Sequence, residues 1–529
     1  MMGFKRITQG VSVMWLRFVV TLLVGIFQLP ILYASFDRTV LGIYMLFFTM
    51  ANFLALADLG LGTVVTRAVS YLKGSQGAPR TELELKAYSK VNLSDLLVTA
   101  CASYAVACGG IFAIGAFAGI MYFDQLSLTP AVVTEVSGAW VIFLVAMGIG
   151  LLSNVPFAYL TGSGNVAPEQ VIRLIHLITR FAAVVILAPL TRSVMALAVA
   201  ELVAALVLLL ASLILLWTQR AEVSLLAGRP RLALAKTMVT QALPMFITRV
   251  GALIILETTP LIVSFTMGPA MVPDFVALKT LAFFGLTIAN SVPQAISPYI
   301  ALAHSAGNPE QVLRYHSLTL RLTMALAIFW FVSLLTWAPN LTRMWLGEAH
   351  FLGYAAVVPL ALMVLLEVHH TAHSMFTWNT GKWPFAPWGI ASGILTLALA
   401  IPGGIYWGYA GIALGGMTAQ LLTNNWYVVY FTLRNLRVSI RDYGKNVVAP
   451  LMGLGIAVAS FAMLLSWVLE THLTVAWVFR GATGAQVLSV LVGGGLTFVF
   501  FGLLAWQILL QVPEKQWLFQ RFRRQVAAS

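Results

Sequence analysis

Long apolar segments separated by short polar breaks follow one another along the whole of this chain. A helix needs about 20 mostly apolar residues to cross the hydrocarbon core of a membrane, and transmembrane strands alternate, as these segments do not. The pattern therefore predicts an all-α polytopic membrane protein with about 14 transmembrane helices. The predicted spans are residues 11–36, 41–70, 92–118, 134–159, 171–190, 194–217, 239–267, 274–303, 318–340, 354–377, 387–404, 408–433, 447–469 and 485–511.

Composition narrows the class of protein further. Of 529 residues, 60% are hydrophobic and 9% are charged, against roughly a quarter charged in an ordinary soluble protein, so a water-soluble globular protein is excluded. The predicted loops are too short for a soluble catalytic domain, and the sequence contains neither a nucleotide-binding Gly-x-x-x-x-Gly-Lys loop nor a nucleophile elbow. We predict that the protein is not an enzyme, has no catalytic residues and needs no cofactor, with H⁺ or Na⁺ as candidate coupling ion.

The basic residues predict an orientation. An even number of spans puts both termini on one side of the membrane, and 22 of the 31 lysines and arginines lie in segments on that side, against four on the other. By the positive-inside rule the termini are cytoplasmic, in a multi-pass protein of the bacterial inner membrane. The net charge of +13 is dispersed among apolar spans, which excludes nucleic acid as a partner. The other five basic residues lie within spans: Arg17, Arg67, Arg180, Arg249 and Lys279.

The first and seventh spans align at an offset of 232 residues, which places Arg17 opposite Arg249. An offset of six spans keeps the starting side, as in transporters built from parallel repeats. We therefore predict two pseudo-symmetric six-helix lobes around a central cavity, followed by two extra helices. The predicted divisions are an N-lobe at 1–220, a C-lobe at 221–435, the extra helices at 436–511 and a basic cytoplasmic tail at 512–529.

Short motifs then resemble a known family. The matching segments are Leu41–Tyr44, Ala57–Gly62, Thr66–Ala68, Leu243–Pro244, Ser297–Pro298 and Trp345–Gly347. Together they resemble the polysaccharide transporter family, the Wzx-type flippases of lipid-linked oligosaccharides, within the multidrug/oligosaccharidyl-lipid/polysaccharide exporter superfamily. The resemblance extends over nearly the whole chain.

The resemblance implies a substrate and a process. We expect a flippase that moves an undecaprenyl-pyrophosphate-linked oligosaccharide repeat unit across the inner membrane by alternating access, for surface polysaccharide biosynthesis. Its expected partners are the lipid-linked substrate, membrane lipids, and the polysaccharide polymerase with other proteins of the assembly pathway. Two alternatives within the superfamily stay open: a multidrug or cation antiporter, and a lipid II flippase of peptidoglycan synthesis.

Cations inside the membrane are the first candidates for a binding site. An arginine at a helix centre costs about 2.5–3.5 kcal/mol on insertion scales, so such residues are usually paired or functional. Because arginine makes bidentate contacts with phosphate, we expect Arg17 and Arg249 to clamp the pyrophosphate, with Lys279 and Arg180 as further contacts. The alternative is that each cation pairs with an acid of the bundle, such as Glu257 or Asp58, and only holds helices together.

Acids inside the membrane are the second set of candidates. A desolvated carboxyl takes up a proton more readily, as a coupling site requires, so we expect this role or a polar cavity lining for Glu257, Asp58, Glu367 and Glu201. Glu257 is favoured because Pro260 follows it and opens the helix backbone. A neutral, hydrogen-bonded acid is the alternative for each. His369 and His373 have the spacing of a zinc helix, but without further ligands we expect a polar lining and no metal site.

Overall fold

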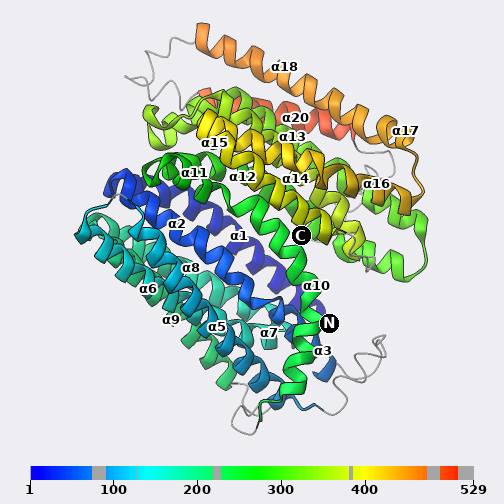
Figure 1. Cartoon of the computed structure of the whole chain (residues 1–529). Helices are drawn as coiled ribbons and strands as arrows, with labels where there is room; N and C mark the ends of the chain where they lie inside the picture. The colour runs from blue at the N-terminus through cyan, green and yellow to red at the C-terminus, as the bar shows by residue number, and fades with distance from the viewer. Residues whose placement is uncertain are drawn as a thin grey trace. The chain divides into compact units, whose positions relative to one another are not determined.

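The protein is described by a computed structural model that covers residues 2–73, 91–126, 128–218, 228–379, 385–472 and 489–509 (Figure 1). Every regular element in these ranges is a helix, which confirms the all-α prediction. The helices form two compact units, Met1–Pro273 and Asp274–Ser529. Each unit is described below by itself.

The first unit contains the helices of the predicted spans 1 to 7. They are α1 (Met2–Ser35), α2 (Arg38–Leu54), the 3-10 helix η1 (Ala55–Asp58), α3 (Leu61–Lys73), α5 (Leu93–Asp124), α6 (Pro130–Leu152), α7 (Asn154–Gly162), α8 (Val166–Thr191), α9 (Val194–Thr218), α10 (Leu232–Glu257), α11 (Thr259–Met267) and η3 (Pro269–Met271).

The second unit contains the remaining helices. They are α12 (Val272–Ser305), whose first two residues belong to the first unit, α13 (Pro309–Leu346), η4 (Glu348–His350), α14 (Tyr354–Asn379), α15 (Ala386–Leu422), α16 (Asn424–Leu436), α17 (Ile440–Tyr443), the π-helix η5 (Gly444–Val448), α18 (Ala449–His472), the π-helix η6 (Ser489–Gly493) and α20 (Gly494–Ile508).

In the described ranges, twelve helices are long and apolar enough to cross a membrane. The bent pair Leu232–Leu243 and Phe246–Glu257, whose halves meet at 50°, makes a thirteenth candidate when it is counted as one span.

The longest apolar helical segment, Pro387–Leu436, reverses direction and comprises two crossings. Its 50 residues would extend about 75 Å as one helix, more than twice the thickness of the hydrocarbon core. At Gly408 the backbone leaves the helical region, with φ 57° and ψ −138°. A Cβ on Gly403 would overlap the Gly411 carbonyl, so the two halves run side by side with their backbones in contact. The twelve or thirteen candidate spans of the described ranges thus include one segment that crosses twice, and the predicted total of about 14 stays a prediction.

Aromatic packing forms the centre of the first unit. The rings of Phe47, Phe123, Trp140 and Phe143 lie 5.1–6.1 Å apart in tilted, edge-on and stacked pairs. Such pairs contribute about 0.5–1.5 kcal/mol each beyond the burial of their area. The Trp140 indole also donates a 2.8 Å hydrogen bond to a backbone carbonyl of α5, which satisfies the polar atom of this buried ring.

Contacts divide the chain at Pro273 and Asp274, and α10 packs on α3 and α5 within the first unit. The predicted lobe boundary at residue 220 rests on the internal repeat and not on contacts, so it stays a prediction. The predicted extra helices correspond to α18 and α20, which both pack on α13. The predicted tail at 512–529 lies outside the described residues.

Candidate functional site

A break within the second predicted span positions the first candidate residue, Asp58. The helix α2 continues into η1, and α3 begins only at Leu61. Between them, Leu59 (φ 50°) and Gly60 (φ 81°) adopt the left-handed conformation. Backbone strain of this kind costs about 1–3 kcal/mol at a residue with a side chain, and such strain is concentrated at functional sites. The break places the Asp58 carboxylate beside neighbouring helices.

Asp58 contacts one side chain from each of two other helices. The Tyr104 hydroxyl on α5 donates to Asp58 Oδ1, and Arg249 Nη1 on α10 lies 3.5 Å from Asp58 Oδ2. A Cβ at Gly62 would lie 3.4 Å from Tyr104 Oη and 3.8 Å from Asp58 Oδ1, so the glycine leaves this carboxylate open. The acid, the phenol and the guanidinium therefore form one cluster within the first unit.

The two charges of this cluster differ in exposure. The Arg249 side chain is 62% exposed, and that of Asp58 is 13% exposed. A separation of 3.5 Å is long for a charge-assisted hydrogen bond, and a guanidinium has five N–H donors. Arg249 is thus held in place by an acid on one side and retains donors for an anionic ligand.

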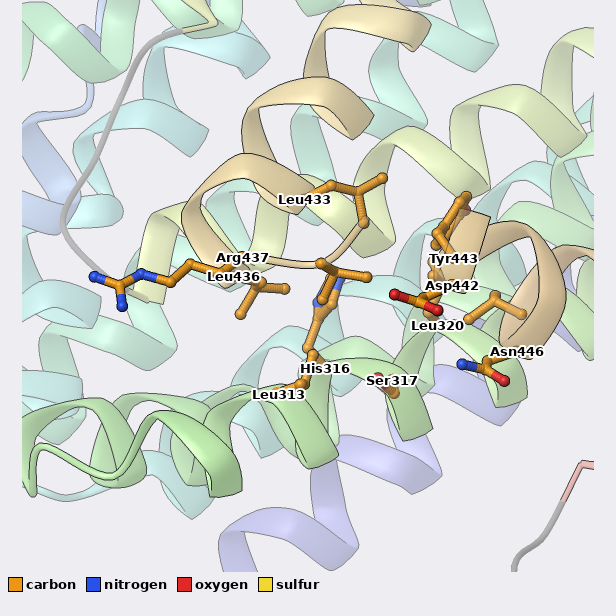
Figure 2. A pocket seen from close by; sticks show the side chains of 12 residues that line it. Leu313, His316, Ser317, Leu320, Leu433, Leu436, Arg437, Asp442, Tyr443 and Asn446 are labelled. Atoms are coloured by element: carbon orange, nitrogen blue, oxygen red, sulfur yellow. The ribbon is translucent and has the colours of Figure 1, made fainter. Parts of the chain in front are cut away.

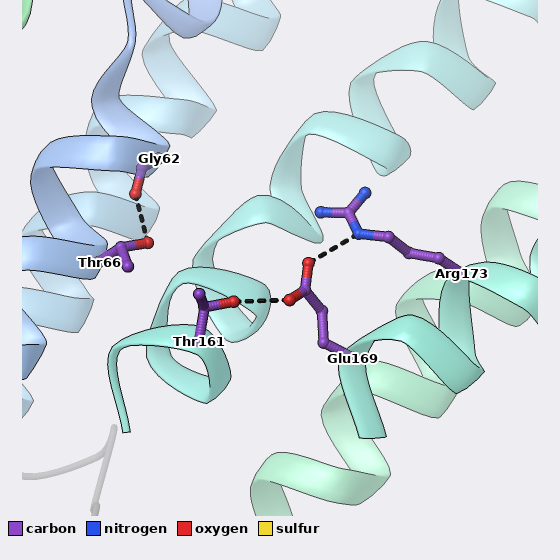
Figure 3. Close-up of polar contacts among 5 residues, drawn as sticks. All are labelled: Gly62, Thr66, Thr161, Glu169 and Arg173. Atoms are coloured by element: carbon purple, nitrogen blue, oxygen red, sulfur yellow. Dashed lines mark hydrogen bonds and ion pairs between the residues drawn. The ribbon is translucent and has the colours of Figure 1, made fainter. Parts of the chain in front are cut away.

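The second predicted cation, Arg17, lies near another acid. It is half-buried on α1, which packs against α8, and its charged neighbours are Glu169 and Arg173. Figure 3 shows that this carboxylate is already engaged: Thr161 Oγ1 donates to Glu169 Oε2 at 2.6 Å, and Arg173 Nε to Glu169 Oε1 at 2.8 Å. The guanidinium groups of Arg17 and Arg173 therefore share the single carboxylate of Glu169, so the three residues together carry a net positive charge.

Arg17 and Arg249, predicted as one clamp, therefore belong to two separate acid-containing clusters of the first unit. Each cluster is compatible with both predicted roles of its arginine, pairing with an acid and binding of a ligand. An acid of the bundle contacts or neighbours the arginine, and part of the arginine's surface stays accessible. The joint clamp stays a prediction.

Arg180 and Glu201, predicted as a substrate contact and a coupling acid, contact each other. Arg180 Nε on α8 lies 2.6 Å from Glu201 Oε1 on α9. Tyr44 on α2 donates to the same carboxylate oxygen at 3.3 Å, and the guanidinium lies 4.7 Å from the ring centre of Phe48. This largely buried network joins three helices, so a substrate would have to compete with Glu201 for Arg180.

Three further predicted residues are Lys279, Glu257 and Glu367. Lys279 is half-buried on α12, with Nζ 5.0 Å from the ring centre of Phe283. Glu257 is half-buried at the end of α10, next to the start of α11. Glu367 is half-buried on α14, and no residue in the described ranges forms an ion pair with it.

Several polar contacts of the first unit were not predicted. The pair Glu169–Arg173 has the i, i+4 spacing of a helical ion pair and could have been found from the sequence. Tyr104 lies within a uniformly apolar segment, and only tertiary packing shows that it contacts Asp58. The second unit adds a histidine cluster on α13 and α14, of which sequence spacing indicated only the part on α14. Across the described residues, no group of three or more His, Cys, Asp or Glu side chains could hold a metal ion.

The sequence matches no protein-family model and no curated protein. Its fold, however, is shared by solved structures of membrane transporters of the MOP superfamily, among them the three described below. The lipid II flippase MurJ in an inward closed conformation matches with a TM-score of 0.68 and 11% identity, over 94% of this chain and 99% of that one.

Two other structures with this fold are transporters of different description. A multidrug resistance MATE family transporter in an inward-facing conformation gives a TM-score of 0.63 at 15% identity, over 79% of this chain and 95% of that one. A MOP superfamily transporter from Pyrococcus furiosus, described by the reverse polarity of its binding pocket, gives 0.59 at 15% identity, over 83% and 97%. At these identities the likeness establishes the fold, and the more specific Wzx-type resemblance stays a prediction.

Proposed function

We propose that this protein is a flippase that translocates an undecaprenyl-pyrophosphate-linked oligosaccharide across the bacterial inner membrane by alternating access, driven by an ion gradient. In this proposal it serves surface polysaccharide biosynthesis, has both termini in the cytoplasm and works with a polysaccharide polymerase. The fold supports membrane transport as the activity, and the charges inside the spans support an anionic headgroup as the ligand.

The observation that carries the proposal is the exposure of the Arg249 side chain and its long separation from Asp58. Arg249 lies within a span, is 62% exposed, and meets its acid partner only at 3.5 Å. Guanidinium groups bind phosphate with two parallel hydrogen bonds, and a charged hydrogen bond contributes about 1.5–3 kcal/mol. Arg17, with an excess positive charge around it, supplies a second attraction for a pyrophosphate.

Asp58 gives this site a means of coupling. While its carboxylate is ionised, it neutralises part of the charge that Arg249 offers to a phosphate. When Asp58 is protonated, it still accepts the hydrogen bond of Tyr104, and Arg249 is released to the substrate. Proton uptake at Asp58 and anion binding at Arg249 would then favour each other. Glu257, Glu367 and Glu201 stay proposed coupling residues as well.

A multidrug antiporter is the first alternative, and pocket polarity argues against it. A cationic drug needs acids at the binding site, whereas the most exposed partner in the Asp58 cluster is a guanidinium. The share of this chain that each structure matches also argues against an antiporter. MurJ matches 94% of the chain and the MATE transporter 79%, and the difference of 15% corresponds to about 80 of the 529 residues. This difference is similar in size to the predicted extra helices.

A lipid II flippase is the second candidate function, and one specific observation favours it. The MurJ structure matches over 94% of this chain, more than either of the other two structures. Lipid II also carries a pyrophosphate on a polyprenyl lipid, so the cationic site described above would suit it equally. The sugar part of the substrate is what separates the two proposals.

Deletion of the gene separates the three functions. We expect a viable strain that loses a surface polysaccharide, accumulates its lipid-linked repeat unit and keeps normal resistance to cationic drugs. Plasmid-borne wild-type protein should restore the polysaccharide, and the Arg249→Ala variant at equal membrane abundance should not. Hypersensitivity to drugs with intact polysaccharide would contradict the proposal in favour of an antiporter, and lysis on depletion would favour the lipid II flippase.

A further inference from the structure

A cluster of imidazole rings lies inside the second unit. His369 and His373 lie one turn apart on α14, with ring centres 4.7 Å apart. His316 on α13 packs against His373 with ring centres 5.2 Å apart. His316 and His373 are buried, so these rings meet in an interior where water is scarce.

The Tyr443 hydroxyl, from α17, joins two of these rings. It lies 2.6 Å from His369 Nε2 and 3.2 Å from His373 Nε2. A phenol has one O–H to donate, so it donates to one of these nitrogens and accepts from the other, which must carry a hydrogen. The two histidines and the tyrosine therefore form a chain in which every hydrogen bond can reverse its direction.

A cavity of about 280 Å³ reaches this cluster from the corner between α16 and α17 (Figure 2). Tyr443 and His316 both line it, which places the phenol between the cavity and the two rings of α14. His316 is 3% exposed, and neither of its ring nitrogens has a hydrogen-bond partner in the described part of the chain. Buried polar atoms are nearly always satisfied, so these nitrogens point to water or a proton as ligand.

Charged groups of both signs lie at the cavity wall. Asp442 lines the cavity, and its carboxylate is fixed by the Ser439 hydroxyl at 2.6 Å. Arg437 also borders the cavity, but Figure 2 shows its guanidinium directed away from His316. The other charged residues and histidines on the packed elements are Glu310, Arg314, Arg321 and Arg343 on α13, Glu367 and His370 on α14, Arg434 on α16, Arg441 on α17 and Lys445 on η5. Of these, Arg321 donates to the Leu509 carbonyl at 2.6 Å, which directs its charge toward α20.

We propose that His316, His369, His373 and Tyr443 form a proton-binding centre of the second unit that is filled from water in this cavity. The proposal rests on the proposed function, because it assigns to this centre a coupling ion for transport. It is distinct from the Asp58 cluster, which belongs to the first unit.

The proton moves through the phenol. A hydronium ion in the cavity gives one proton to Tyr443 Oη, and its O–H bond breaks as a new one forms. The original Oη–H bond breaks in the same step, and its proton forms an N–H bond on the imidazole nitrogen that had accepted it. The net change converts hydronium and imidazole into water and imidazolium, with the phenol unchanged.

This centre takes up one proton, and the uptake changes the hydration of the cavity. A second imidazolium within about 5 Å of the first would be strongly repelled, so the rings act as one site. A buried cation is costly unless water or a counter-charge reaches it, so proton uptake favours hydration of the cavity and an outward movement of the α16–α17 corner. Proton binding and the shape of this corner are thereby coupled.

The direct test is a histidine titration of the full-length protein in lipid nanodiscs, without any lipid-linked sugar. Carbon-13 labelling of the imidazoles and single His→Gln variants for assignment would follow each ring from about pH 8 to about pH 5. We expect His369 and His373 to titrate together, with one proton taken up by the pair. Tyr443→Phe removes the acceptor that stabilises the imidazolium, so the midpoint should fall by about one pH unit, a ten-fold loss of proton affinity.

The exposed His304, at the end of α12, supplies the matched control, since His304→Gln should leave the titration of the pair unchanged. Two rings that titrate independently, or that stay neutral at about pH 5 with Tyr443 present or absent, would overturn the proposal. Because no sugar lipid is used, this result is independent of the deletion experiment. A coupled titration would stand even if that strain contradicted the flippase, and its absence would leave the flippase untouched.

Discussion

At the scale of the residue, the cations inside the spans differ in how far their charge is already satisfied. Arg180 makes a 2.6 Å ion pair and packs on an aromatic ring, whereas Arg249 is 62% exposed and 3.5 Å from its acid. Guanidinium groups of the first kind hold helices together, and those of the second kind are available to ligands. This difference is the reason why we propose a structural role for Arg180 and a binding role for Arg249.

The Arg180–Glu201 pair gives a stability prediction. Loss of one partner of a buried pair costs about 3–5 kcal/mol, because the other charge stays buried alone. We therefore expect Arg180→Leu or Glu201→Leu to lower the Tm of the purified protein by several degrees, and the double variant to regain most of the loss. The measurement is thermal unfolding in detergent. A double variant with wild-type Tm but no transport would show instead that Arg180 acts on the substrate.

Gly42, within one of the family-like motifs, gives a packing prediction. A Cβ at this position of α2 would overlap the Pro269 carbonyl of η3, and backbone atoms cannot move aside as a flexible side chain would. We expect Gly42→Ala to reduce the folded yield and to destabilise the protein by about 1–3 kcal/mol. Gly110→Ala on α5 is the matched control, because nothing lies within 4 Å of its added Cβ. Equal yield and Tm for the two variants would refute this contact.

At the scale of the element, most of the fold could be predicted because the membrane restricts the solutions. A run of about 20 apolar residues in a bilayer can only form a helix. The helices could therefore be identified without a helical spacing of apolar and polar residues. The contacts between helices were harder. Tyr104 with Asp58, and Arg180 with Glu201, depend on the rotation and register of whole helices, which uniformly apolar sequences leave unspecified. The charged residues within the spans could be identified from the sequence, and Asp58 could be named as a possible partner for an arginine, but contacts such as those of Tyr104 and Glu201 could not be predicted.

The reversal at Gly408 is an element-scale prediction that can be tested by labelling. Cysteines would be placed at Tyr406, which is 77% exposed beside the turn, and at the exposed Arg434 on α16, after replacement of Cys101 and Cys108 by serine. We expect an impermeant maleimide to label position 406 from outside intact cells, and position 434 only after permeabilisation. Labelling of both from the same side would mean that this segment enters and leaves the membrane on one face.

At the scale of the whole molecule, the charges fall into two classes with different consequences. By the positive-inside rule, we predict that the 22 basic residues of the predicted cytoplasmic segments orient the chain, whereas the few within the spans are the candidates for anion binding. The structures that share the fold include a flippase and a drug transporter, so the fold does not identify the substrate. In our proposal the polarity of single residues decides the substrate, and Arg249 and Asp58 are the first to test.

The most direct test is translocation of an undecaprenyl-pyrophosphate-linked oligosaccharide by the purified protein in liposomes, measured as its protection from an external glycosidase. We expect wild-type protein to translocate the lipid, and Arg249→Ala to reduce the rate about ten- to hundred-fold, as loss of one charged contact implies. Asp58→Asn removes the negative charge that competes with the substrate for Arg249, so this variant should bind the lipid more tightly than the wild-type protein does. Wild-type rates from Arg249→Ala, or no translocation by the wild-type protein, would contradict the account.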